Sequence, residues 1–200
     1  MKQHYDAAPR DPANHLALSP LSFLKRAETV YANLPAVTYG DIRRSWRETG
    51  ARCRAVASGL AALGVGRGAT VSVLSANIPQ LFELHDAVPL LGAVLNAVNT
   101  RLEPETVAYI LDHSDCRLVI ADTALAPLLR QAFELNDKAL PVVDIVDVPG
   151  QIGFGQIGFG QTGFGQTSYD DLAAHPPMDW ALPGDEWQAL ALDGSVAQIS

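Results

Sequence analysis

Apolar residues along the chain follow two different spacings, which predict helices and strands in alternation. Positions that recur every three or four residues are typical of one face of a helix. This spacing occurs in residues 20–31, 45–63, 79–91, 104–113 and a segment capped by Thr123. Short, nearly continuous apolar runs indicate buried strands. They are found in residues 70–74, 93–98, 117–121 and 141–148.

The order of these segments from residue 70 onward is strand, helix, strand, helix, strand, helix, strand. Strands that alternate with helices pair in parallel through right-handed crossovers, which bring helices onto the faces of the sheet. The predicted fold class is therefore α/β, with a parallel sheet covered by helices on both faces.

Local signals predict where several elements begin. Ser19 and Pro20 form a typical helix start, because serine caps the helix and proline has no amide hydrogen to leave unpaired. Gly40-Asp41 joins two short runs and predicts a tight hairpin. Ser45 and Glu48 have the spacing of a capping box, so a long helix is expected to follow.

The chain divides into four segments by composition. Residues 1–18 form a polar N-terminal tail and residues 19–149 form the α/β region. Residues 150–167 repeat the unit GQ(I/T)GF, a low-complexity Gly/Phe/Gln pentapeptide that predicts a surface insertion and is either slippage-type repetition or an interaction motif. Residues 168–200 form a tail with one predicted strand, Trp187–Leu192.

Length and charge exclude several functions. Two hundred residues make about one domain with a sufficient hydrophobic core. The formal net charge is −8, which disfavours a nucleic-acid partner. Basic residues cluster only between positions 43 and 54, and we interpret this cluster as a solvated helix face. Its members are Arg43, Arg44, Arg47, Arg52 and Arg54.

The remaining compositional signals predict a cytoplasmic protein. Cys53 and Cys116 both lie inside predicted regular elements, as is usual for thiols of a reducing compartment. The first fifteen residues lack the apolar core of a signal peptide. The most apolar window, residues 87–98, is too short for a transmembrane segment.

Motifs that could carry chemistry are incomplete. Residues 153–158 match G-x-G-x-x-G, but more glycine repeats follow where dinucleotide binding needs a helix. His113 and Cys116 lack a second pair of zinc ligands. His85 and Asp86 are adjacent in a helix and therefore point apart. The residues alone predict no catalytic, cofactor-binding or metal-binding side chain.

Five segments together resemble the N-terminal portion of the AMP-forming acyl-CoA synthetases of the adenylate-forming ligase superfamily. They are Pro35–Asp41, Ala57–Gly68 (ASGLAALGVGRG), Val71–Pro79 (VSVLSANIP), Leu91–Leu102 (LGAVLNAVNTRL) and Tyr109–Ile120 (YILDHSDCRLVI). The runs NAVNTRL and DEWQALAL are similar to the branch that activates fatty and related carboxylic acids. The resemblance covers residues 19–192, about the first third of a complete enzyme.

The resemblance implies a reaction of a carboxylic acid, ATP with Mg²⁺, and CoA. It also implies that a phosphate loop follows Trp187–Leu192, whereas residues 193–200 read DGSVAQIS. Neither the loop nor the family's catalytic lysine has a match, so no residue inherits a catalytic role. We expect a fragment truncated before the phosphate loop, with no cofactor bound and no catalysis by this chain alone.

Two alternatives stay open. The chain is either such a fragment or a non-catalytic module that pairs with an intact synthetase through an open sheet edge and the repeat. A dinucleotide-binding protein is a third, weaker hypothesis. The sequence leaves open the acid substrate and whether the chain forms a homo-oligomer.

Overall fold

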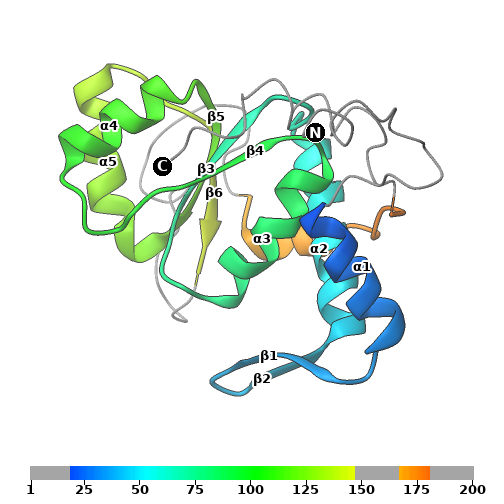
Figure 1. Ribbon diagram of the computed structural model, residues 1–200. Coiled ribbons are helices and arrows are strands. Elements are labelled where there is room, and N and C mark those ends of the chain that lie inside the picture. The colour runs from blue at the N-terminus through cyan, green and yellow to red at the C-terminus, as the bar shows by residue number, and fades with distance from the viewer. Residues whose placement is uncertain (1–18, 147–166, 181–200) are drawn as a thin grey trace, which may run out of the picture.

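The computed structural model describes residues 19–146 and 167–180, which form a four-stranded parallel sheet, a separate hairpin and flanking helices (Figure 1). The strand order in the sheet is β4-β3-β5-β6, and β1 pairs with β2 in the hairpin. The strands are β1 Pro35–Tyr39, β2 Ile42–Ser45, β3 Thr70–Leu74, β4 Val94–Ala97, β5 Cys116–Asp122 and β6 Val142–Ile145. The helices are α1 Pro20–Val30, α2 Trp46–Ala62, α3 Pro79–Leu90, α4 Pro104–His113, α5 Ala126–Asn136 and α6 Tyr169–Ala173.

Helices cover both faces of the sheet, so the predicted α/β architecture is confirmed. In Figure 1, α4 and α5 lie together on one side of the sheet, and α1, α2, α3 and α6 lie on the other. Each side has its own apolar core, built around Leu60, Leu84 and Ile120 on the α2 side and around Leu111, Leu129 and Phe133 on the α4 side. All five residues of β3 are buried between the two layers.

The predicted capping box and hairpin turn both form, and α1 begins at Pro20 as predicted, but the predicted Ser19 cap was wrong because the Ser19 side chain makes no capping hydrogen bond. The Ser45 hydroxyl accepts a hydrogen bond from the Glu48 amide, and a Glu48 carboxylate oxygen accepts one from the Ser45 amide at 2.7 Å. Gly40 has a positive φ of 52°, which a turn between β1 and β2 requires and glycine adopts without strain. The hairpin extends away from the sheet, with β1 lying between β2 and α3 (Figure 1).

Two other local predictions were wrong in detail. Asp122, rather than Thr123, supplies the cap, because its side chain accepts a hydrogen bond from the Ala124 amide and starts a 3₁₀ turn before α5. The apolar spacing of residues 20–31 predicted one buried helix face, and Leu24 of α1 is buried, but Phe23 and Val30, which share that spacing, are exposed. The helical spacing of these residues predicted the helix correctly. It predicted only part of the face that the helix buries.

The segment of residues 167–180 packs against the α/β region. It is joined to β6 where the Asp144 amide donates to the Thr167 carbonyl at 3.1 Å. The backbone of Leu172 in α6 approaches α2 so closely that a methyl group added to Gly59 would lie 2.7 Å from the Leu172 Cα. The absence of a side chain at Gly59, in the last turn of α2, therefore allows α6 to pack this closely.

The other sequence predictions lie outside the described residues. These are the polar tail up to residue 18, the repeat up to residue 166 and the strand Trp187–Leu192. Within residues 19–146 and 167–180, no helix has the length and apolar character needed to cross a membrane.

Candidate functional site

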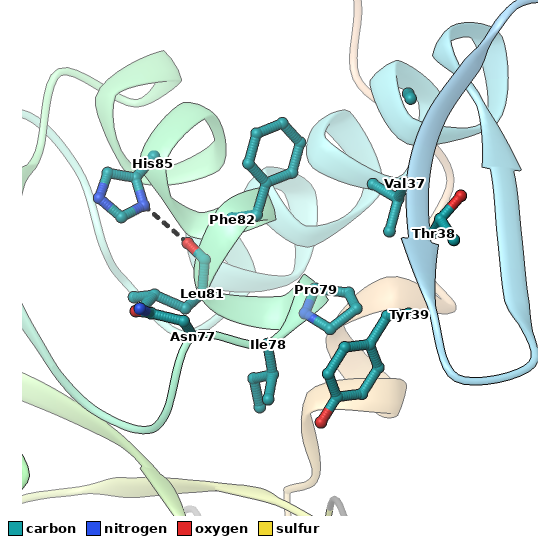
Figure 2. Close-up of a pocket in the computed structure, with 10 residues that line it drawn as sticks. Val37, Thr38, Tyr39, Asn77, Ile78, Pro79, Leu81, Phe82 and His85 are labelled. Atoms are coloured by element: carbon teal, nitrogen blue, oxygen red, sulfur yellow. Dashed lines mark hydrogen bonds between the residues drawn. The ribbon is translucent and has the colours of Figure 1, made fainter.

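A groove of about 620 Å³ separates the hairpin from the start of α3 (Figure 2). One wall is formed by residues 36–39 of β1, and the other by residues 77–79, Leu81, Phe82 and His85. The second wall directly follows the carboxyl end of β3 in the chain. Ligands of open α/β sheets bind outside the carboxyl ends of the strands, so this groove lies on the side where a ligand is expected.

The side chains around the groove are mostly apolar. Figure 2 shows Val37 on the side of β1 that faces Phe82, and Tyr39 directed toward the space below Pro79. Phe82 is 41 % exposed. His85 uses its Nδ1 in a 2.8 Å contact with the Leu81 carbonyl of its own helix. This lining suits the binding of an apolar group better than acid–base chemistry.

The carboxylate of Glu83 in α3 is fully buried and holds three parts of the fold together. Its Oε1 accepts hydrogen bonds from Arg44 of β2 at 2.6 Å and from Arg52 of α2 at 2.8 Å. Its Oε2 accepts the hydroxyl hydrogen of Tyr169 in α6 at 2.9 Å. Glu83 therefore fixes the hairpin, α2 and α6 relative to α3.

The electrostatics of this cluster indicate a structural role. Burial raises the pKa of Tyr169 well above its ordinary value, and the neighbouring Glu83 carboxylate raises it further. Burial opposes the charge on Arg52, but the hydrogen bond and charge of Glu83 outweigh it and raise the pKa of Arg52. The tyrosine thus stays protonated and the arginine charged, so neither takes up or releases a proton near neutral pH.

The interpretation of the basic cluster as a solvated helix face was wrong for three of its five members. Arg44 and Arg52 pair with Glu83 as described above, with 19 % and 26 % of their side chains exposed. Arg54 pairs with Glu28 of α1 at 2.6 Å and lies over the ring of Trp180. Arg43 and Arg47 are exposed as expected, although Arg43 lies in β2 and not on a helix. The burial depends on acidic partners from distant segments, which spacing alone does not reveal.

The structure does not assemble the other candidate residues into a site. The His113 ring stacks on Tyr109 at the surface of α4, whereas Cys116 is buried at the start of β5. Burial raises the pKa of both Cys53 and Cys116, which disfavours the reactive thiolate, as expected for core residues. Across residues 19–146 and 167–180, no three His, Cys, Asp or Glu side chains are grouped so that they could hold a metal ion.

Sequence reasoning missed both the groove and the buried carboxylate. The groove brings together residues 36–39 and 77–85, which are far apart in the chain. A signal for Glu83 was present, because it is an acidic residue between apolar neighbours in a helix with few other charges. The sequence also contained a sign of the groove, because the polar residue Asn77 follows the carboxyl end of the buried strand predicted over residues 70–74.

Comparison with known proteins gives consistent matches. The family model described as "AMP-binding enzyme" matches residues 24–160. The 2-methylpropanoate–CoA ligase of Humulus lupulus is 39 % identical over 190 residues, which cover 94 % of this chain and 34 % of that protein. The peroxisomal acetate/butyrate–CoA ligase of Arabidopsis thaliana is 36 % identical, with the same coverage of both chains. The chain spans about a third of the length of these relatives.

Solved structures share the fold. The anthranilate–CoA ligase AuaEII, in complex with anthranoyl-AMP, aligns with a TM-score of 0.67 and 23 % identity, over 85 % of this chain and 29 % of that one. A putative long-chain-fatty-acid–CoA ligase from Rhodopseudomonas palustris aligns with a TM-score of 0.65 and 26 % identity, over 81 % of this chain and 38 % of that one.

Proposed function

The chain belongs to the AMP-binding enzyme family, and from this premise we propose that it is the N-terminal part of an AMP-forming acyl-CoA ligase. The observation that carries the proposal is the alignment of 94 % of the chain with 2-methylpropanoate–CoA ligase at 39 % identity. The four-stranded sheet and its two helical layers match the fold of the two solved CoA ligases.

The proposed reaction has two steps. The carboxylate of the acid attacks the α-phosphate of ATP, with Mg²⁺ as the counter-ion, and forms an acyl-adenylate while pyrophosphate leaves. The thiol of CoA then attacks the acyl carbon, loses its proton and releases AMP. The relatives are named for 2-methylpropanoate, acetate and butyrate, so short aliphatic monocarboxylic acids are the substrate class to test first.

Within this reaction, we propose that the 200 residues supply scaffold rather than catalytic groups. Phosphoryl chemistry needs positive charge and backbone donors fixed around the phosphates. The final eight residues, DGSVAQIS, contain one glycine and no lysine, where the resemblance places a glycine-rich phosphate loop. The chain alone is therefore proposed to bind neither ATP nor CoA tightly.

A cytoplasmic location and a role in fatty acid metabolism are also part of the proposal. One of the two relatives is named as peroxisomal. Imaging of the tagged chain beside a peroxisomal marker distinguishes these two compartments.

A chimera tests the proposed function. The aligned residues of this chain replace the corresponding third of the 2-methylpropanoate–CoA ligase, and CoA thioester formation is measured with 2-methylpropanoate, butyrate and acetate. We expect the chimera to form the thioester in an ATP-dependent reaction, because the substituted segment belongs to the same family and is proposed to have the same role. A folded chimera with no activity on any acid contradicts the proposal.

The 200-residue chain is assayed in parallel. Pyrophosphate release is measured with ATP, Mg²⁺, CoA and each acid, and we expect no acid-dependent signal. Sustained acid-dependent turnover by this chain overturns the scaffold role and leaves the family assignment intact.

A further inference from the structure

We propose that copies of this chain associate head to tail, with the outer face of α1 in one copy packed against the outer face of α4 in the next. The α1 face consists of Phe23, Arg26 and Val30, and the α4 face consists of Glu105, Tyr109 and Asp112. The inference concerns self-association and does not depend on the proposed function. It follows from the exposure, the charge and the placement of the two faces.

The α1 face is apolar with a cation at its centre. Phe23 and Val30 are about two helical turns apart, so they lie on the same side of α1. That side is opposite Leu21 and Leu24, which are buried in the core. Phe23 is 61 % exposed and Val30 is 59 % exposed. Arg26 is also exposed and lies between them, because residues three and four apart are neighbours on a helix surface.

The α4 face has the opposite arrangement, with an aromatic ring between two acids. Tyr109 is 63 % exposed, and Glu105 and Asp112 lie about one turn before it and one turn after it. The His113 ring stacks on the Tyr109 ring and supports its orientation. Lys138 approaches Asp112 at 3.9 Å but leaves 71 % of the Asp112 side chain exposed. The acids of this face are therefore accessible to a cation from another molecule.

These two faces carry the most exposed apolar side chains of residues 19–146 and 167–180. In that part of the chain, Tyr109, Phe23 and Val30 exceed every other large apolar side chain in exposed fraction. Exposed apolar surface that is bordered by polar groups marks interaction sites. One copy cannot bring its own two faces together, because the sheet and the layer of α2 and α3 lie between α1 and α4 (Figure 1).

Charge complementarity favours a second copy of this chain as the partner. The cation of the α1 face can pair with the acids of the α4 face, and its planar guanidinium can stack on the Tyr109 ring. Lys25 and Arg47 are exposed as well and add positive charge around α1, whereas Glu28 of α1 pairs internally with Arg54. Like charges oppose the pairing of α1 with α1 and of α4 with α4, so the head-to-tail arrangement is the favoured one.

The proposed contact joins two different faces, so it does not close on itself in a dimer. Each added copy leaves one α1 face and one α4 face available at the ends, which builds an open chain or a ring. Exposed ion pairs add little affinity, so we expect association at about 10–500 μM. The mean mass in solution should rise with concentration beyond that of a dimer.

Sedimentation velocity of the 200-residue chain and its variants tests the contact. We expect Arg26→Glu and Glu105→Arg each to weaken association at least about tenfold, because each reverses the charge of one face. Each variant keeps the other face intact, so an equimolar mixture should form dimers at concentrations where either variant alone is monomeric. An original chain that stays monomeric throughout overturns the proposal. So does a Glu105→Arg variant that associates like the original chain, since the interface would then not include α4.

The sign of the charge change separates a local contact from general repulsion. Glu105→Arg raises the net charge by two units, from −8 to −6. A smaller net charge weakens the repulsion between copies, so general electrostatics predicts stronger association, whereas the proposed contact predicts weaker association. Asp170→Arg makes the same change at an exposed acid of α6 and is the matched control. Equal effects of the two substitutions contradict the proposal.

Further variants keep the result decisive. Glu105 lies in the first turn of α4, where a cation is unfavourable, so Asp112→Arg near the other end of the helix reverses the same face if circular dichroism shows that Glu105→Arg is unfolded. Phe23→Ser keeps every charge and should also weaken association at least about tenfold, and unchanged association contradicts the proposed packing. Association that appears only after deletion of residues 1–18 assigns the α1 face to that segment and overturns the proposal.

Discussion

Replacement of Glu83 by glutamine removes the charge that holds the hairpin, α2 and α6 together. The side chain is fully buried and accepts three hydrogen bonds, from Arg44, Arg52 and Tyr169. Glutamine has nearly the same shape, so the variant tests charge and hydrogen bonding rather than volume. Its amide group has one carbonyl oxygen, and at least one of the three donors must lose its acceptor.

The expected loss follows from the burial of the partners. Breaking a buried ion pair by removing one charge costs about 3–5 kcal/mol. The two arginines keep 19 % and 26 % of their side chains exposed, so they regain part of their hydration, and we expect the lower end, about 3 kcal/mol. For a chain of this length, 1 kcal/mol corresponds to about 2–4 °C in melting temperature, so the drop is about 6–12 °C.

Urea unfolding followed by circular dichroism measures this loss directly. Tyr169→Phe removes one hydroxyl from the same cluster and should cost about 1.5–3 kcal/mol, because that hydrogen bond is made to a charged group. Glu134→Gln is the matched control on the exposed surface of α5, with an expected change within about 0.5 kcal/mol. If Glu83→Gln is no more destabilising than Glu134→Gln, the cluster does not stabilise the fold and the reasoning is refuted.

Three further predictions concern other parts of the fold. Gly59→Ala should destabilise by about 1–2 kcal/mol in urea unfolding, because its methyl group would meet the α6 backbone at 2.7 Å, whereas Gly66→Ala, which meets nothing, should be neutral. Burial raises the pKa of Asp86 to about 6, so the folded state binds its proton more tightly and stability falls as the pH rises from about 4 to 6. Asp86→Asn should therefore match the original chain below about pH 4 and exceed it by about 2 kcal/mol above pH 7, and a constant difference across a pH series would contradict this. Deletion of residues 150–164 should raise the free energy of unfolding by no more than about 1 kcal/mol, because β6 and Thr167 are already hydrogen-bonded and the entropy of loop closure changes slowly with loop length. A decrease in the free energy of unfolding of more than about 2 kcal/mol would show that these residues support the fold.

Most of the fold was predictable because its signals are local. The capping box of Ser45 and Glu48 and the Gly40 turn each depend on a few neighbouring residues, and each occurs as expected. The parallel sheet followed from the alternation of apolar runs with helical spacing, since few topologies connect such elements.

The site was harder to predict because its contacts join distant segments. Arg44 and Glu83 are 39 positions apart, and Tyr169 lies 86 positions beyond Glu83. A run of arginines looks the same in sequence whether it faces water or a buried carboxylate. Only the packing of α3 against α2 decides this, and that packing is a property of the whole domain.

The hydrogen bond between Asp144 and Thr167 has a consequence for how this gene can vary. Because the flanking backbone is already closed at that point, we expect that whole units of five codons can be added or removed there with the reading frame and the fold both retained. Purifying selection for a folded domain therefore places little constraint on the copy number of the unit, and sister lineages should differ in it.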